Sequence, residues 1–267
     1  MKIKLVFLVL IIIISCNIPA KENQKRPNII FMMSDDHTSQ AWGIYGGVLE
    51  KYIINKNIKR LAAEGVVLEN AFCTNSICVP SRASILTGQY SHKNQVYTLT
   101  DALQPDQPNV AKILSKSGYQ TALIGKWHLK KQPSGFDYFK VLPGQGRYNN
   151  PLLKDIHNWE DGNKGGKVYE GFSSDVIMDE SIKWLDSRNK DKPFMLMTHF
   201  KATHEPFDYP DRFKDLFKGE NLPEPESLLD FYPGESGRTF EGQILEILTE
   251  RWRSATQAKS NRYPGLP

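Results

Sequence analysis

A cysteine precedes a short helix-like run in the segment SICVPSRASILTG, residues 76–88. Pro80 suits the first turn of a helix, since its fixed backbone angle is helical and its missing N–H would have no partner there. The free amide groups and the positive dipole end of such a helix favour an anion near Cys78. Arg82, one turn later, adds a fork-shaped donor that suits sulfate or phosphate. These surroundings predict a thiol with a lowered pKa beside an anion-binding site.

Residue type alone leaves four roles open for Cys78. It can be a structural thiol, a metal ligand, the disulfide partner of Cys73, or the precursor of a more reactive group. A disulfide between Cys73 and Cys78 is geometrically conceivable in an oxidising compartment. Zinc is not indicated, because the sequence has no C-x-x-C pair and no cluster of cysteines and histidines.

Other polar residues capable of chemistry lie at or just after the ends of predicted strands. They are Asp35 and Asp36, Lys126 and His128, and His199 and His204. Since ligands collect at the carboxyl ends of parallel strands, we expect these residues to share one site. An adjacent Asp pair also suits a helix cap with a solvated neighbour, whereas in a cleft its hard oxygen atoms suit Ca²⁺ or Mg²⁺.

Apolar runs predict the strands that place these residues. They lie within residues 28–36, 66–72, 119–126 and 194–200, with the sequences NIIFMMSDD, VVLENAF, YQTALIGK and FMLMTHF. Uninterrupted apolar runs are typical of strands that are buried on both faces, as in a parallel sheet.

Amphipathic segments alternate with these strands and predict helices within residues 57–65, 80–88, 107–118 and 173–188. In the last segment, Met178, Ile182 and Leu185 have the spacing of one apolar face. Residues 133–172 are rich in Gly, Pro, Asn and aromatic residues, which predicts a long functional loop or an inserted segment. The alternation indicates an α/β fold with a mostly parallel central sheet flanked by helices.

Two motifs, in order along the chain, carry a resemblance to a known family. Residues 78–88 match the pattern C-x-P-x-R-x-x-x-x-T-G, and GYQTALIGKWHL follows at 118–129. The strand that ends in Asp35-Asp36 resembles the first metal-binding element of the same family, and THEP at 203–206 resembles its His-x-Pro element. The chain resembles the type I, formylglycine-dependent sulfatases of the alkaline-phosphatase-like superfamily, over about residues 27–210.

This resemblance implies that a formylglycine-generating maturation enzyme oxidises Cys78 to an aldehyde. One hydroxyl of the hydrated aldehyde would attack sulfur and the other would expel sulfate, which regenerates the aldehyde and divides one hard step into two easier ones. Asp35, Asp36 and Cys78 would bind Ca²⁺, in preference to Mg²⁺, and the metal would act as a Lewis acid and a template.

The resemblance also implies roles for the residues around the nucleophile. Arg82 would orient the formylglycine, and Lys126 would stabilise charge on the sulfate oxygens. His128 would hold a formylglycine hydroxyl and help its deprotonation. His204 is the candidate acid for the leaving alcohol, with His199 as its competitor.

The family pattern is incomplete in this chain. Sulfatase catalytic domains are longer and carry, in their C-terminal part, an Asp-Asn/His-Gly metal element and another sulfate-binding lysine. No such element follows residue 205, and DFYPG at 230–234 does not supply it. We therefore expect an alkaline-phosphatase-like fold that is truncated at its C-terminus, with a half-built metal site, an exposed sheet edge, low stability and little activity alone.

The N-terminus predicts export. MKIKLVFLVLIIIIS has two lysines and then an unbroken apolar run, as in a signal peptide, and the run is short for a membrane span. Ile13-Ile14-Ser15-Cys16 resembles the lipobox of bacterial lipoproteins, in which the cysteine receives lipid, and an ordinary signal peptide is the alternative. The predicted organisation is a signal peptide at 1–15, a tether at 16–26 and an incomplete sulfatase domain at 27–267. The expected location is the bacterial cell envelope, in the periplasm or at the cell surface.

The charge balance gives no case for nucleic acid as a partner. Removal of Lys2 and Lys4 with the signal peptide leaves 32 basic and 30 acidic residues, a net charge of +2, and no basic run interleaves with aromatic residues. The predicted function is hydrolysis of a sulfate ester on a sulfated glycan. Two alternatives remain open: a phosphomonoester or phosphonate ester hydrolase of the same superfamily, and an inactive lipoprotein that binds sulfated glycans.

Overall fold

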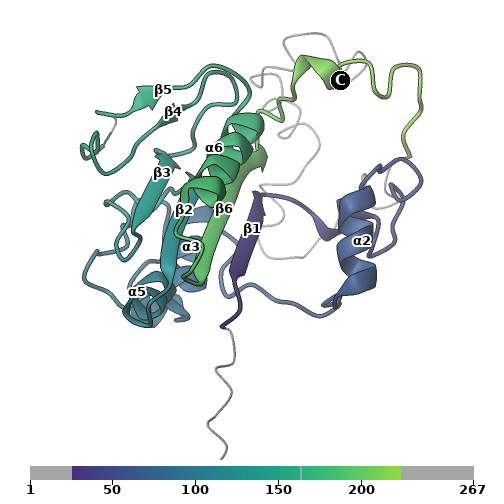
Figure 1. Ribbon diagram of the computed structural model, residues 1–267. Coiled ribbons are helices and arrows are strands. Elements are labelled where there is room, and N and C mark those ends of the chain that lie inside the picture. Colours follow the sequence, from purple (N-terminus) through teal and green to yellow (C-terminus); the bar gives the residue numbers. More distant parts are fainter. Residues whose placement is uncertain (1–25, 163, 224–267) are drawn as a thin grey trace, which may run out of the picture.

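Four parallel strands form the central sheet, in the order β1–β6–β2–β3 (Figure 1). The computed structural model describes residues 26–162 and 164–223. The strands are β1 (Ile29–Asp35), β2 (Gln120–Lys126), β3 (Tyr138–Leu142) and β6 (Phe194–Thr203). The long strand β6 lies between β1 and β2, with Met195 aligned with Ile29 on one side and with Thr121 on the other. The predicted parallel sheet is confirmed.

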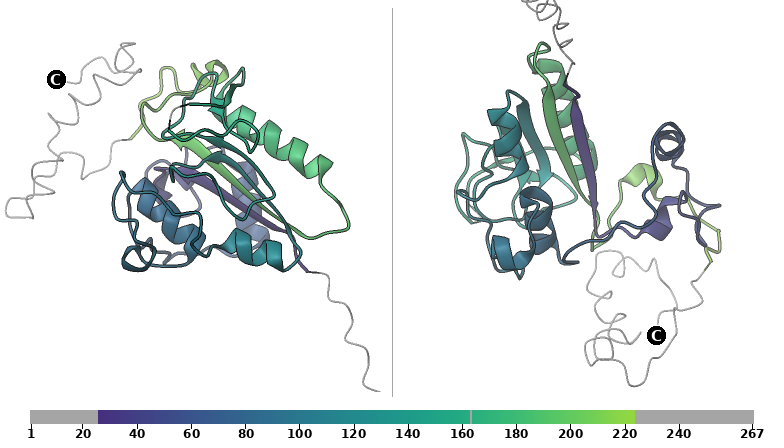
Figure 2. Two further views of the ribbon diagram at one scale, coloured as in Figure 1. Left: turned by 90° about the vertical axis from the view of Figure 1, so that its left-hand side faces the viewer. Right: turned by 90° about the horizontal axis from the view of Figure 1, so that it is seen from below.

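Helices cover both faces of this sheet, as Figure 2 shows. One face packs against α3 (Cys78–Thr87) and α5 (Val110–Lys116), and the other packs against α6 (Ser173–Ser187). Neighbouring side chains of β2 enter different cores, because successive residues of a strand point to opposite faces. Leu123 packs on the α3 side, whereas Ile124 packs on the α6 side. The result is the predicted α/β fold, with helices on both faces of the sheet.

The remaining elements belong neither to the central sheet nor to the three helices that cover it. They are α2 (Lys56–Glu64), α4 (Ser91–Asn94), β4 (Leu152–Leu153), β5 (Lys167–Val168), and the 3-10 turns η1 (Ser39–Trp42) and η2 (Asp211–Phe213). β4 and β5 form a separate antiparallel pair. β3, β4 and β5 all lie within residues 133–172. The segment predicted as a long loop or an inserted segment therefore contains three short strands.

Two local predictions are wrong. Residues 66–72 do not form a strand, and their apolar side chains have no sheet to pack against: Val66 and Phe72 are 84% and 90% exposed. In α6, the buried face contains Val176, Ile177 and Trp184; of the predicted face, Leu185 packs partly against this core, whereas Ile182 is exposed. The Trp184 ring meets Phe194 edge to face at 5.8 Å, and this large aromatic contact fixes the rotation of the helix.

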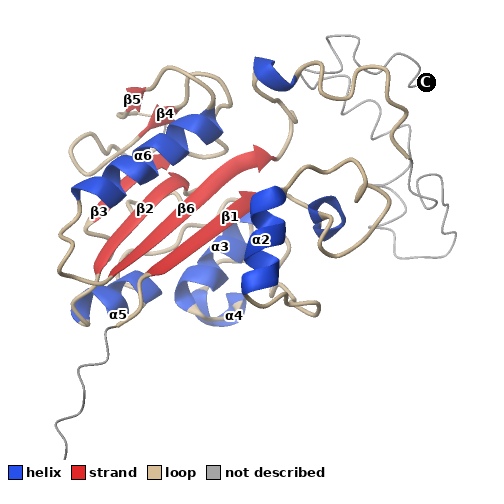
Figure 3. Cartoon of the chain, turned by 45° about the vertical axis from the view of Figure 1, so that its right-hand side comes forward, coloured by secondary structure: helices blue, strands red, loops and turns tan. Residues whose placement is uncertain are grey.

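Strand β1 is the end strand of the sheet among the described residues. Ile30 and Met32 share one face of β1, and each is 55% exposed. Helix α2 lies on this side of the sheet (Figure 3) and buries none of its side chains. The expected exposed edge is therefore present in the described part of the chain.

None of the described helices is both long and apolar enough to cross a membrane. The predicted signal peptide, Cys16 and residues 224–267 lie outside the described residues. The boundaries proposed at residues 15 and 26 therefore stay predictions.

Candidate active site

Four predicted site residues lie where a strand or helix begins or ends. Asp35 and Lys126 are the last residues of β1 and β2, and His204 directly follows β6. Cys78 is the first residue of α3, as expected from Pro80 in its first turn, and Gly88 ends that helix in the left-handed conformation. Because β1 and β2 flank β6 in a parallel sheet, the carboxyl ends of all three strands lie at the same edge, and these side chains meet there.

The backbones of β2 and β6 approach closely just before Lys126. Gly125 has φ +107°, and a Cβ atom at this position would lie 1.8 Å from the carbonyl oxygen of His199. Only glycine allows this approach, because any side chain would overlap the neighbouring strand. The glycine of the GYQTALIGKWHL motif thus helps to place Lys126 at the site.

A buried carboxylate with two cations forms the floor of the site. Arg82 Nη2 donates to Asp35 Oδ1 at 3.0 Å, and Lys126 Nζ donates to Asp35 Oδ2. All three side chains are buried. Burial raises the pKa of the Asp35 carboxyl, but Arg82 and Lys126 together outweigh burial and hold that pKa below its usual range. Two cations against one carboxylate leave an excess of positive charge, which favours an anionic ligand.

Cys78 lies beside this cluster and pairs with His204. Their hydrogen bond is the largest influence on both groups: it lowers the pKa of the Cys78 thiol and raises the pKa of the His204 imidazole, while burial opposes each change. His204 Nδ1 lies 2.9 Å from the carbonyl oxygen of Glu205, a contact that orients the ring. Cys73 and Cys78 are both free thiols, so the disulfide between them is not formed.

His128 and His199 are both neutral at pH 7 but differ in their surroundings. Burial, reinforced by the charge of Lys126, lowers the pKa of His128 to about 4, and its buried Nδ1 has no hydrogen-bond partner among the described residues. Burial also lowers the pKa of His199 to about 3. His199 Nδ1 lies 3.2 Å from the carbonyl oxygen of Lys126, inside the sheet. Of the two competing histidines, His204 is therefore the one that contacts Cys78.

Among the described residues, Asp35, Cys78 and His204 form the group whose ligand atoms could hold a metal ion, and these atoms lie within 4.8 Å of one another. Asp36 follows Asp35 but is exposed and lies outside this group. The carboxylates of Asp35 and Asp36 are hard ligands of the kind that Ca²⁺ takes, although both Asp35 oxygens already accept hydrogen bonds. The described residues thus fit a divalent cation in kind and supply only part of the roughly six to eight oxygens that Ca²⁺ binds.

Sequence reasoning missed three residues at the site. Gln145 accepts a hydrogen bond from Lys126 Nζ, and Tyr148 donates to the carbonyl oxygen of His204. Lys201 is buried and points toward the His204–Glu205 turn. A lysine within the apolar run of β6 was a usable signal, whereas the two loop residues gave none beyond their place in a glycine-rich segment.

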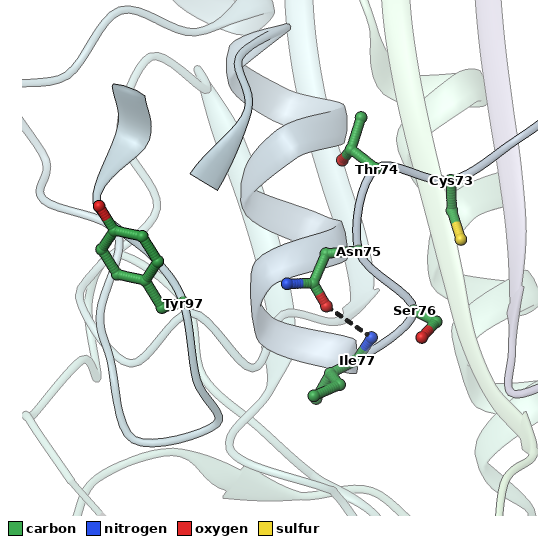
Figure 4. A pocket seen from close by; sticks show the side chains of 6 residues that line it. All are labelled: Cys73, Thr74, Asn75, Ser76, Ile77 and Tyr97. Atoms are coloured by element: carbon green, nitrogen blue, oxygen red, sulfur yellow. Dashed lines mark hydrogen bonds between the residues drawn. The ribbon is translucent and has the colours of Figure 1, made fainter. Parts of the chain in front are cut away.

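A pocket of about 420 Å³ adjoins the segment that leads into Cys78 (Figure 4). The chain from Cys73 to Ile77 lines one part of it, and the ring of Tyr97 lies across from this segment. Asn75 Oδ1 accepts from the Ile77 amide at 3.1 Å, which fixes the turn before α3. The pocket offers polar groups and one aromatic ring, and its lining ends at Ile77, one residue before the candidate nucleophile in the sequence.

The family model described as Sulfatase matches residues 27–258. The chain belongs to the sulfatase family. The match spans every predicted site residue from Asp35 to His204, so the sulfatase motifs and the site at the strand ends coincide.

Curated relatives agree with this assignment to the sulfatases. An N-acetylglucosamine-6-O-sulfatase of Bacteroides thetaiotaomicron is 42% identical over 240 residues, which are 89% of this chain and 42% of that protein. The human N-acetylgalactosamine-6-sulfatase is 28% identical over 211 residues, 67% of this chain and 40% of that protein. The chain spans less than half the length of these two relatives.

Solved structures show that the sulfatase fold is alkaline-phosphatase-like. A structure determined in complex with its substrate, D-glucosamine-2-N,6-O-disulfate, has a TM-score of 0.75 and 37% identity, covering 89% of this chain and 49% of that one. A sulfatase structure named as YidJ from Bacteroides fragilis has a TM-score of 0.67 at 21% identity, covers 85% of this chain and 56% of that one, and shows the fold alone.

Proposed function

We propose that this chain carries the nucleophile part of a sulfatase active site and that the site hydrolyses a sulfate ester of a carbohydrate. The observation that carries the proposal is the buried pairing of Asp35 with Arg82 and Lys126 beside the Cys78–His204 pair. An excess of buried positive charge next to a nucleophile at a helix N-terminus suits a tetrahedral oxyanion better than a neutral substrate.

The substrate class follows from the relatives together with the pocket. The relative with 42% identity is named for N-acetylglucosamine 6-O-sulfate, and a structure with 37% identity holds a sulfated glucosamine. We therefore propose a 6-O-sulfated amino sugar, or a glycan that ends in one. The pocket before Cys78 would receive the sugar, with the exposed ring of Tyr97 as an apolar surface for its C–H groups.

Cys78 would act after oxidation to formylglycine, whose hydrate supplies a hydroxyl that attacks sulfur and a second hydroxyl that releases sulfate. Arg82 would hold this side chain through its charge, since its guanidinium is fixed by Asp35 and by the carbonyl oxygen of Lys126 at 2.7 Å. Lys126 would stabilise the sulfate oxygens. Neutral His128 would accept a proton at Nδ1, the buried atom without a partner among the described residues.

His204 would give its proton to the leaving alcohol of the sugar. Before maturation the hydrogen bond to Cys78 raises the pKa of His204, and the same contact places its ring beside the side chain that would become the nucleophile. Asp35 and the side chain at position 78 would hold Ca²⁺, which would supply Lewis-acid stabilisation of sulfate when bound, whereas the predicted ligand Asp36 is exposed and lies outside this group. The net reaction would convert a sulfate ester and water into an alcohol and sulfate.

Location and partners are proposed from the sequence. The chain would be exported to the cell envelope, with Cys16 as a lipid anchor, and a maturation enzyme would modify Cys78. Sulfated glycans would then be processed outside the cytoplasm.

Mass spectrometry of the peptide around Cys78 tests the nucleophile. We expect the aldehyde form, about 18 Da lighter than cysteine by atom counting, after co-expression with a maturation enzyme. Release of sulfate from glucosamine 6-sulfate in the presence of Ca²⁺ tests the reaction. Cys78→Ala should abolish release, while the control Tyr119→Phe, directly before β2 and outside the site and the pocket, should retain it.

Three results would overturn the proposal. Faster hydrolysis of a matched phosphate ester would favour the phosphoesterase alternative. Binding of a sulfated glycan without turnover by the aldehyde form would favour an inactive binding protein. An unmodified thiol after co-expression would remove the nucleophile.

A further inference from the structure

We propose that Tyr148 and Lys201 are positioning residues that hold the His204–Glu205 turn from two sides and so aim the His204 ring at the leaving group. The proposal rests on the proposed function of His204. It concerns the backbone of the turn and not a new contact with substrate.

Both side chains grip carbonyl groups of this turn. The Tyr148 hydroxyl donates to the carbonyl oxygen of His204, and Lys201 Nζ donates to the carbonyl oxygen of Glu205 at 3.2 Å. The same Glu205 carbonyl lies 2.9 Å from His204 Nδ1. Lys201 thus fixes the acceptor that orients the imidazole ring, and Tyr148 fixes the backbone that carries it.

The two side chains also support each other. Lys201 Nζ lies 4.7 Å from the centre of the Tyr148 ring, a cation–π arrangement. The Tyr148 ring stacks on Phe172 at 5.4 Å, directly before α6. Burial raises the pKa of the Tyr148 phenol, so the hydroxyl stays protonated and remains a donor. The turn is therefore tied to the rigid α6 side of the fold.

Lys201 is unusual because it is a buried lysine without a carboxylate partner among the described residues. Its residue is 3% exposed, and no carboxylate of a described residue lies within 4.0 Å of its ammonium. Burial lowers its pKa to about 8, with help from the nearby charge of Lys126. A buried lysine without a carboxylate is costly. Its contacts are instead the Tyr148 ring and the turn that carries His204.

The leaving group gives a test that separates positioning from general stability. A sugar alcohol leaves poorly and needs a proton from His204, whereas a nitrophenolate leaves without one. In Tyr148→Phe, which keeps the ring and removes the hydroxyl, we expect kcat for a sugar sulfate to fall about 10- to 100-fold. We expect kcat for nitrophenyl sulfate to change by less than about twofold, and KM for both to stay nearly constant. Tyr119→Phe is the matched control, because Tyr119 directly precedes β2 and the site lies where β2 ends. It should change neither rate.

Hydrogen exchange gives a second test that needs no activity. The amides of His204 and Phe207 donate to the carbonyl oxygens of Lys201 and His204, at 3.1 and 3.2 Å. We expect Tyr148→Phe and Lys201→Met each to speed exchange at these two amides, while exchange at the amides of β6 is unchanged. Tyr119→Phe should leave both amides as they are.

The outcomes separate the two proposals. Faster exchange in a protein that hydrolyses neither ester would retain the clamp on the turn and refute the proposed function. Unchanged exchange in both variants would refute the clamp, whatever the activity. An equal loss of rate on both esters would also refute positioning of the acid.

Discussion

The buried carboxylate of Asp35 is the most informative place to perturb this site. Asp35→Asn keeps the shape and removes the charge, so that Arg82 and Lys126 stay buried without their counter-charge. A unit-charge pair at the 3.0 Å separation of Arg82 and Asp35 interacts by about 5.5 kcal/mol at an effective dielectric constant of about 20. Part of this is offset because the amide is easier to bury than the carboxylate. Breaking a buried pair on one side costs about 3–5 kcal/mol, and we expect Asp35→Asn to lower the free energy of unfolding by about that amount.

The assay is denaturant unfolding at pH 7 with a chelator present, so that metal binding does not contribute. Asp175→Asn is the matched control, because Asp175 makes a bidentate ion pair with Arg212 at 2.7 and 2.8 Å but the two side chains are 43% and 54% exposed. We expect little or no loss there, since water screens that pair. The double variant Asp35→Asn/Lys126→Met should recover part of the loss, because it removes one of the unpaired cations.

The same carboxylate gives a pH dependence with a defined sign. The pKa of Asp35 is lower in the folded protein than in the unfolded chain, so its contribution is complete above the unfolded value, near 3.9, and is lost as pH falls through the lower folded value. The difference in stability between the unsubstituted protein and Asp35→Asn should therefore shrink below about pH 4. A loss for Asp35→Asn no larger than for Asp175→Asn would refute the reasoning, as would a difference that does not shrink in acid.

Three further predictions test other features. In the unmatured protein, the rate at which iodoacetamide alkylates Cys78, followed by peptide mass spectrometry, should reach half its maximum at a lower pH than for an ordinary cysteine. His204→Gln should move this midpoint to higher pH, and an unchanged midpoint would contradict the hydrogen bond between Cys78 and His204. Gly125→Ala should lower the free energy of unfolding by about 2 kcal/mol or more, because its Cβ would overlap the carbonyl oxygen of His199. Gly46→Ala, at a position with positive φ but open space, should lower it less, and equal losses would refute the close approach of β2 and β6 at Gly125. In denaturant unfolding, Trp184→Ala should lower the free energy of unfolding by about 3–5 kcal/mol and Ile182→Ala by less than about 0.5 kcal/mol. A larger loss for Ile182→Ala than for Trp184→Ala would support the buried helix face predicted from the spacing.

Elements with a strong local signal could be predicted from the sequence. The uninterrupted apolar runs before Asp35 and Lys126 are strands β1 and β2, and the proline and glycine around residues 80–88 mark the ends of helix α3. Residues 66–72 have the same apolar character but no neighbouring strand, so composition alone misassigned them. Pairing depends on distant residues, which a local pattern does not contain.

The site residues likewise divide into those that the sequence predicted and those that it did not. Asp35, Arg82 and Lys126 belong to motifs or strand ends, and the structure brings them into contact. Tyr148 and Gln145 come from an irregular loop whose path is set by tertiary packing, so no spacing rule points to them. The exposed position of Asp36, outside the group formed by Asp35, Cys78 and His204, also depends on the backbone after β1 and cannot be read from two adjacent letters.

The place of β1 beside β6 has a consequence for the order in which the protein folds. Asn28 Oδ1 accepts from the Phe194 amide 166 residues away, and β1 pairs with no other strand of the described sheet. During synthesis the first strand must therefore wait, unpaired, until nearly all the described chain has emerged. Long-range parallel pairing of this kind makes folding slow. Since Asp35 is the last residue of β1, the pairing of β1 with β6 and the contact of Asp35 with Arg82 and Lys126 would form together, late in folding.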